Sequence, residues 1–283
     1  DRIKEAEGLV KKAKAEGVKE DLIKRLKKLF NINKFSTNID PPQKITNQLL
    51  RLRKQGNLMK VVEQANLLVR QYRGSFLLWN ILGASHKDLN QLDEAIKAFE
   101  KVIELNPLDA DGFNNIGTAY QDQGKLEKAI EAFNKAISLN PNHVGALYNR
   151  GNSFNYQGKR DDAVKSFKKA ISINPNHFKA YNNLGNVLKD QNKLDEAIKS
   201  YTRALSIKPD FAAARSQKFY QQAQISDWLA IEKEKSFLID LGIIGQYIPP
   251  LSVLSLEDEP ERHRLRSENY AREMFSKNCV LFF

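Results

Sequence analysis

The sequence predicts an all-α fold, a right-handed superhelical solenoid of stacked helix pairs, because its pattern repeats at a fixed period. Residues 113–141 read FNNIGTAYQDQGKLEKAIEAFNKAISLNP, and residues 181–209 repeat most of that pattern as YNNLGNVLKDQNKLDEAIKSYTRALSIKP. Four prolines follow one another at a constant spacing of 34 residues: Pro107, Pro141, Pro175 and Pro209. A constant period of this order is typical of stacked supersecondary units.

Each repeating unit contains two amphipathic helices. In residues 110–143, Phe113, Ile116 and Tyr120 share one face of the first helix, and Ala129 and Phe133 share one face of the second. The prolines end or follow the second helix, because proline lacks an N–H group and disfavours helical geometry in the residue before it. Glycine and alanine recur at the same spacing, where we expect helices to approach closely: Gly83, Gly117, Gly151 and Gly185, then Ala95, Ala129, Ala163 and Ala197.

Between the two helices of each unit lies a residue that readily adopts positive φ. Asparagine and glycine are the residue types that most often end a helix in this conformation. The positions are Asn90, Gly124, Gly158 and Asn192.

The order aromatic, Leu, Gly, Tyr, Ala, Phe, Ala and Pro resembles the tetratricopeptide repeat. The resemblance covers Phe76 to Phe211. It implies four helix-pair units: 76–109, 110–143, 144–177 and 178–211. The departures are Arg150 at a position that is usually apolar, Val102 where alanine is usual, and His86 where an aromatic residue is usual.

Two segments flank these units on the N-terminal side. Residues 1–40 are predicted to form a basic helical hairpin and a linker; the hairpin covers the exposed end of the solenoid, or binds an anionic membrane or a partner helix. Residues 41–75 keep Gly56 at the expected position but have Arg73 at the proline position, so we interpret them as a degenerate helix-pair repeat.

Asparagines recur on the first helices at positions that the apolar core does not require. Asparagine is a mediocre helix former, and its amide both donates and accepts hydrogen bonds. Two interpretations follow: the amides hold the backbone of an extended polypeptide in a concave groove, which we favour, or they cap or bridge neighbouring helices inside the stack. The candidate groove residues are Asn80, Asn114, Asn115, Asn149, Asn152, Asn182, Asn183 and Asn186.

This series resembles the asparagine ladder of the O-linked N-acetylglucosamine transferases, which holds extended polypeptide. A second adaptor type, the dicarboxylate clamp of tetratricopeptide co-chaperones, needs lysine and arginine at set positions of the first helices. This chain has asparagine or tyrosine where the leading lysine of that clamp should be, which argues against it.

Residues 212–283 are predicted to be a helical junction. Asp227-Trp228, Pro249-Pro250 with Leu254, and the segment 262–270 resemble the start of the glycosyltransferase region in bacterial proteins similar to O-linked N-acetylglucosamine transferase and the SPINDLY group. Animal members carry a histidine pair after the proline, whereas Pro250 and Leu251 stand here. The two nucleotide-sugar-binding lobes of those enzymes are not in the sequence, so we expect a fragment or a truncated relative.

Composition argues against several classes of partner. The formal net charge of +11 would suit nucleic acid or an acidic membrane, but the lysines follow exposed helix faces and no aromatic residues interleave with them for base stacking. We therefore expect neither partner. The single cysteine, Cys279, cannot form an internal disulfide and favours a reducing, cytoplasmic compartment. No apolar run approaches the roughly 20 residues of a membrane helix.

No catalytic or metal-binding constellation is evident. His143 and His177 lie one period apart, so stacking holds them on the order of 10 Å apart, whereas the ligands of one metal ion lie about 2 Å from it. We expect both to be loop residues, and His263 has no partner in sequence. No glycine-rich turn could hold a diphosphate. We therefore expect no catalytic residue, metal, cofactor or small-molecule substrate in this chain, and whether it belongs to an enzyme stays open.

The sequence thus favours a protein-binding module for extended polypeptide segments, as the substrate-recognition arm of a protein similar to O-linked N-acetylglucosamine transferase. The alternative is a free-standing adaptor or assembly scaffold. An RNA- or membrane-binding role through the basic N-terminus is a third hypothesis, and a homo-oligomer is compatible with the sequence.

Overall fold

The computed structural model describes residue 18 and residues 40–234, 236–237, 241–243 and 259–278. Thirteen helices and no strand lie in this part of the chain, in agreement with the predicted all-α fold. Apart from residues 18 and 40, the predicted hairpin and linker of residues 1–40 lie outside the described residues, as do Pro249-Pro250 and Leu254. None of the described helices is long and apolar enough to cross a membrane. The chain divides into two compact units, Asp1–Lys128 and Ala129–Phe283.

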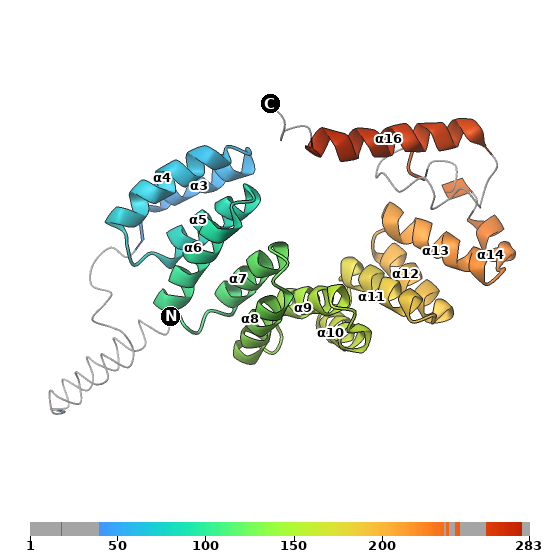
Figure 1. Cartoon of the computed structure of the whole chain (residues 1–283), viewed down its shortest axis with the longest axis horizontal. Helices are drawn as coiled ribbons and strands as arrows, with labels where there is room; N and C mark the ends of the chain where they lie inside the picture. Colours follow the sequence, from blue (N-terminus) through green and yellow to red (C-terminus); the bar gives the residue numbers. More distant parts are fainter. Residues whose placement is uncertain (1–17, 19–39, 235, 238–240, 244–258, 279–283) are drawn as a thin grey trace. The chain divides into compact units, whose positions relative to one another are not determined.

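The first unit is a run of consecutive helix hairpins (Figure 1). From α3 to α7 each helix packs against the next, and the first helices of neighbouring hairpins, α3 with α5 and α5 with α7, also contact each other. A core of Leu49, Val61, Val69, Leu78 and Ile81 joins the first two hairpins. The helices are α3 (Gln43–Lys54), α4 (Leu58–Gln71), α5 (Phe76–Asp88), α6 (Leu92–Leu105), α7 (Ala110–Asp122) and the start of α8 (Leu126–Leu139).

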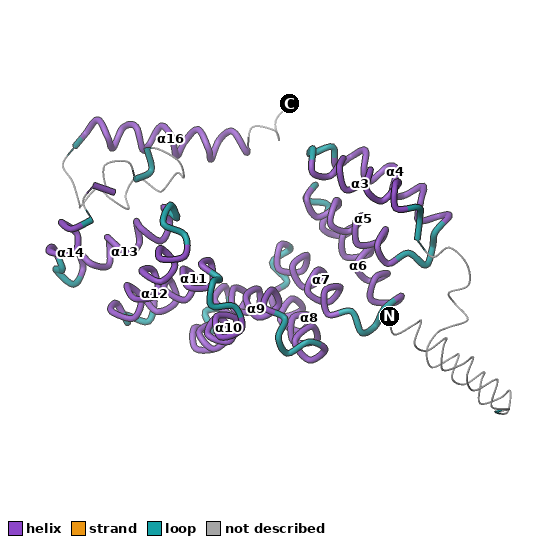
Figure 2. Tube along the Cα trace, turned by 180° about the vertical axis from the view of Figure 1, so that it is seen from behind, coloured by secondary structure: helices purple, strands orange, loops and turns teal. Residues whose placement is uncertain are grey.

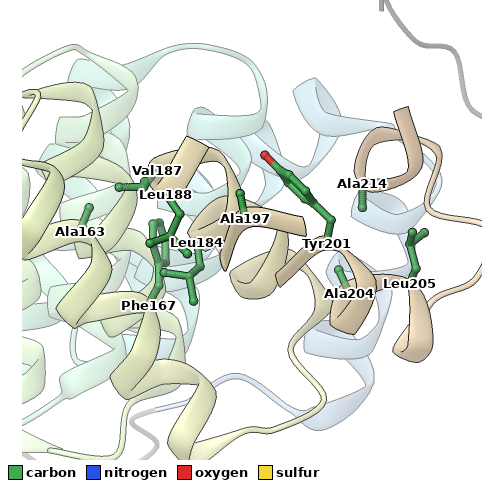
Figure 3. Packing of buried hydrophobic residues seen from close by; sticks show 10 residues of the cluster. All are labelled: Ala163, Phe167, Leu184, Val187, Leu188, Ala197, Tyr201, Ala204, Leu205 and Ala214. Atoms are coloured by element: carbon green, nitrogen blue, oxygen red, sulfur yellow. The ribbon is translucent and has the colours of Figure 1, made fainter. Parts of the chain in front are cut away.

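In the second unit, the helices from α9 to α14 likewise pack each against the next. The described residues of this unit form only helices and connecting loops in Figure 2, apart from one isolated bridge residue. Phe167, Leu184 and Leu188 meet in its largest core cluster (Figure 3). After the rest of α8, the helices are α9 (Val144–Tyr156), α10 (Arg160–Ile173), α11 (Phe178–Asp190), α12 (Leu194–Ile207), α13 (Ala212–Gln224), α14 (Trp228–Lys233) and α16 (Pro260–Asn278).

Three of the four repeated glycines, Gly83, Gly151 and Gly185, are sites of close helix approach, as predicted. A Cβ atom added to Gly83 would lie 2.7 Å from a ring carbon of Phe99, and one added to Gly151 would lie 2.7 Å from Phe167. The third pair is Gly185 with Tyr201, at 2.6 Å. Only a residue without a side chain lets the two helices of a hairpin come this near, because carbon atoms normally approach to about 3.5–4.0 Å.

The turns between the paired helices also follow the prediction and extend it. Asn90, Gly124, Gly158 and Asn192 all have positive φ. Gly56 has φ +77°, and Ser226, which lies 34 residues after Asn192, has φ +59°. The backbone therefore keeps the 34-residue period through α13 and α14, although the repeated residue types are no longer found at that spacing after Ala212.

His143 and His177 cap helices. The Nδ1 atom of His143 accepts a hydrogen bond from the backbone N–H of Ala146 at 3.1 Å, and that of His177 accepts one from Ala180 at 3.2 Å. One and two periods upstream of His143, Asp109 and Ser75 cap α7 and α5 in the same way. A ring nitrogen that accepts a hydrogen bond must be unprotonated, so both caps require that Nδ1 carry no proton.

Candidate functional site

In the first unit, two candidate asparagines pair with each other. Asn80 lies on α5 and Asn115 on α7, the first helices of adjacent hairpins, and both side chains are half-buried. The Nδ2 atom of Asn115 donates a hydrogen bond to Oδ1 of Asn80 at 3.2 Å. The amides thus link neighbouring first helices. Asn114 lies beside Asn115 on α7 and is also half-buried.

In the second unit, Asn183 on α11 is the centre of a polar network. Its Nδ2 atom donates to Oδ1 of Asn152 at 2.8 Å and to the hydroxyl oxygen of Tyr148 at 3.1 Å, and both partners lie on α9. The Oδ1 atom of Asn183 accepts a hydrogen bond from Nδ2 of Asn182 at 3.1 Å. Asn149 lies on the same helix as these partners and is half-buried.

Asn182 and Asn186 on α11 have buried polar atoms as neighbours or among their own atoms. Asn182 is only 8% exposed, and its Oδ1 atom is buried without a hydrogen-bond partner among the described residues. Asn186 accepts a hydrogen bond at 2.8 Å from the hydroxyl group of Tyr201, which is fully buried. Burial raises the pKa of the Tyr201 hydroxyl, and the charge of Asp190 adds to the rise, so this group stays a donor at neutral pH.

The structure therefore links five of the eight candidate asparagines by hydrogen bonds within their units, in Asn80–Asn115 and in Asn152–Asn183–Asn182. Hydrogen bonds between neighbouring first helices are what the bridging interpretation expects. One bridging hydrogen bond does not use the whole hydrogen-bonding capacity of an amide, which has two N–H donors and two lone pairs on its oxygen. Asn115, for example, uses one donor toward Asn80.

Sequence reasoning missed two residues of this region. Tyr148 occupies the position that Asn80, Asn114 and Asn182 hold in the other units, so its departure from the series was the available signal. Its ring also lies 4.9 Å from the ring of His177, between centroids.

Arg150 is the second missed residue, although its departure from the apolar pattern is visible in the sequence. It donates from Nη1 to Oδ1 of Asn134 on α8 at 2.8 Å and from Nε to the Ser166 hydroxyl on α10 at 3.2 Å. Desolvation lowers the pKa of its guanidinium group, opposed by the charge of Asp162. A guanidinium group remains charged under such conditions, so Arg150 is a cation joining three helices of the second unit.

Comparison with protein families identifies the repeats. A tetratricopeptide repeat model matches residues 110–143 and 178–211, and a second model described as a TPR repeat matches residues 83–124 and 151–191. The chain therefore contains tetratricopeptide repeats, as the resemblance in the sequence implied. No curated protein matches the chain.

Solved structures show the same fold. MamA is 25% identical, with a TM-score of 0.52, over 57% of this chain and 95% of MamA. PilF of Pseudomonas aeruginosa is 15% identical, with a TM-score of 0.61, over 79% of this chain and 95% of PilF. YrrB, described as a TPR protein with an unusual peptide-binding site, is 20% identical, with a TM-score of 0.50, over 64% of this chain and 93% of YrrB.

Proposed function

We propose that this chain is a protein-interaction module that binds an extended polypeptide through asparagine amides on the first helices of its repeats. Tetratricopeptide-repeat proteins mediate protein–protein contacts or scaffolding, and YrrB is described as having a peptide-binding site. The observation that carries the proposal is the placement of the amides. All but the buried Asn182 are half-buried, they lie on first helices in both units, and neighbouring amides form hydrogen bonds with one another.

Fixed amides suit backbone recognition for a physical reason. A peptide backbone presents alternating N–H and C=O groups, and an amide side chain can pair with either. Hydrogen bonds between Asn115 and Asn80, and between Asn183 and Asn152, restrict the side chains before a ligand arrives. Less side-chain entropy is then lost on binding. Such a surface makes few contacts with the side chains of the peptide, so we expect it to bind peptides of many different sequences.

The test begins with a display library of unstructured peptides selected against the folded protein. Affinities of the selected peptides are then measured by fluorescence anisotropy for wild type and for a variant with Asn115, Asn149 and Asn183 changed to Ala. Each lost hydrogen bond contributes about 0.5–1.5 kcal/mol, so we expect affinity to fall at least about tenfold.

A matched control variant carries three alanine changes at exposed asparagines on other surfaces: Asn66, Asn142 and Asn176. Circular dichroism verifies that both variants are folded. The proposal is wrong if the variant with Asn115, Asn149 and Asn183 changed to Ala binds the peptides as tightly as the control variant does, or if no peptide is selected at all. In those outcomes the asparagines only bridge helices.

A narrower proposal is that the module is the substrate-recognition arm of a protein similar to O-linked N-acetylglucosamine transferase. Its support is the asparagine series together with the junction motifs at Asp227-Trp228 and residues 262–270. The alternative is a free-standing adaptor or scaffold. Peptide mapping of the native protein separates the two: peptides encoded beyond Phe283 that form a glycosyltransferase region support the arm, and a polypeptide ending there supports the adaptor.

A further inference from the structure

The last helix pair of the described solenoid replaces apolar core positions with charged and polar residues. Arg215 lies one period after Tyr181, Lys218 one period after Leu184, and Gln222 one period after Leu188. In α11, Leu184 and Leu188 belong to the core cluster of the second unit. Their counterparts in α13 are equally enclosed, with Lys218 6% and Gln222 3% exposed, and Arg215 is 8% exposed although Tyr181 is only partly buried.

Both cations converge on one carboxylate. Nη1 of Arg215 lies 3.3 Å from Oε2 of Glu234, and Nζ of Lys218 forms a short ion pair with Oε1 of the same residue. Nη2 of Arg215 donates to the backbone carbonyl oxygen of Pro209 at 2.7 Å. The guanidinium carbon lies 3.9 Å from the centre of the Phe237 ring. Glu234 follows the six-residue helix α14 directly.

The charges in this cluster do not balance. Two buried cations share one carboxylate in the described part of the chain, which leaves one positive charge in excess. Burying an incompletely neutralised charge costs free energy. Desolvation lowers the pKa of Arg215, opposed by the charge of Glu234, which agrees with this picture. On the same helix Gln221, 1% exposed, has an Nε2 donor that is buried and unpartnered among the described residues.

The cluster also has hydrogen-bonding capacity to spare and lies next to the surface. An ammonium group has three N–H donors, and among the described residues the Nζ of Lys218 uses one of them, toward Glu234. The Glu234 side chain is 31% exposed and Phe237 is 51% exposed, so both groups that cover the cations face solvent on one side. An anion can therefore reach the cations by displacing Glu234.

We propose that Arg215 and Lys218 form a binding site for a carboxylate group of an acidic segment in a partner protein, and that Glu234 occupies this site within the chain. The partner's carboxylate replaces that of Glu234 and receives the same two charge-assisted hydrogen bonds. The site lies on α13, apart from the candidate asparagines, so it goes beyond the proposed function and does not depend on it.

The test uses the full chain and a fluorescein-labelled peptide of alternating Glu and Gly residues, with a Gln–Gly peptide of equal length as the uncharged probe. Glu234→Gln removes the internal competitor, and we expect the Glu–Gly peptide to bind this variant at least about tenfold more tightly than wild type. Thermal melting provides a second readout, because a ligand that binds only the folded state raises the melting temperature.

Lys218→Met covers the case in which Glu234→Gln does not fold. It leaves one cation with one carboxylate, Arg215 with Glu234, and we expect it to bind the Glu–Gly peptide about tenfold more weakly than wild type. The control is Lys199→Met, which removes an exposed cation from α12. The proposal is overturned if Lys218→Met binds as tightly as Lys199→Met, if folded Glu234→Gln binds no more tightly than wild type, or if the Gln–Gly peptide binds equally well.

Discussion

Replacing Gly151 by alanine tests the packing of the helix pair α9–α10. The new Cβ would lie 2.7 Å from Cε1, 2.8 Å from Cδ1 and 3.0 Å from Cζ of Phe167, whose ring is fully buried. These distances are shorter than the normal carbon–carbon contact by about 0.5–1 Å. The ring packs against Tyr148, with 5.9 Å between the centroids, so it has little room to move. The two helices must then separate.

The expected net effect combines two opposing contributions. Overpacking a core costs about 1–3 kcal/mol, and because three ring atoms are affected we expect the upper half of that range. Alanine is a better helix former than glycine by about 1 kcal/mol. The free energy of unfolding should therefore fall by about 1–2 kcal/mol, measured by urea denaturation of the wild type and the variant.

A double-mutant cycle identifies the clash as the cause. Phe167→Leu creates space, so adding Gly151→Ala to that background should cost less than in the wild type, with a coupling free energy of at least about 0.5 kcal/mol. Gly158→Ala serves as the comparison, because a Cβ atom at Gly158 would meet open space but the residue has a φ of +74°. The loss of stability in this variant should therefore arise from backbone strain, and it should show no coupling free energy with Phe167→Leu. A Gly151→Ala variant as stable as wild type, or one without coupling, would refute the reasoning.

Two further predictions concern buried polar groups. Burial lowers the pKa of His177 in the folded chain, so the unfolded chain binds more protons in acid. This group should not reduce the free energy of unfolding above the unfolded-state pKa of histidine. The free energy of unfolding should fall as pH drops from that value to the lower pKa of the folded chain. His177→Asn keeps a capping residue without that titration, so its urea midpoint should change less between neutral pH and pH about 5.5 than that of wild type; an equal change in both contradicts the assignment. Tyr201→Phe removes the hydrogen bond to Asn186 and should lower the free energy of unfolding by about 1 kcal/mol in the same assay, and no loss would show that this bond does not stabilise the fold.

The sequence was sufficient for the fold because its signals are local and repeated. The proline period, the close-approach glycines and the positive-φ turns each follow from one residue type at one spacing, and the structure shows the glycine contacts and the turn geometry at Asn90, Gly124, Gly158 and Asn192. The positive φ of Ser226 was not predicted, because serine adopts this conformation much less often than glycine or asparagine does.

The polar contacts were less accessible to prediction. The asparagine series was evident from spacing, but the partner of each amide depends on side-chain directions across two helices. Asn183 bonds to Tyr148 and Asn152 on α9, which lie 35 and 31 residues away in sequence. The cluster of Arg215, Lys218 and Glu234 gave an even weaker signal, since arginine and lysine in a helix usually indicate an exposed face. Only their spacing from the core positions of α11 marks them as enclosed.

The most direct test of the central claim, recognition of polypeptide backbone by the asparagine amides, compares three forms of one selected peptide. They are the original sequence, a scrambled sequence of the same composition, and the original sequence with alternate backbone nitrogens methylated. If the amides bind the backbone, scrambling should change the dissociation constant by less than about threefold, and methylation should raise it by at least about tenfold. A peptide that tolerates methylation but loses binding on scrambling would contradict the account, because its side chains would then carry the recognition.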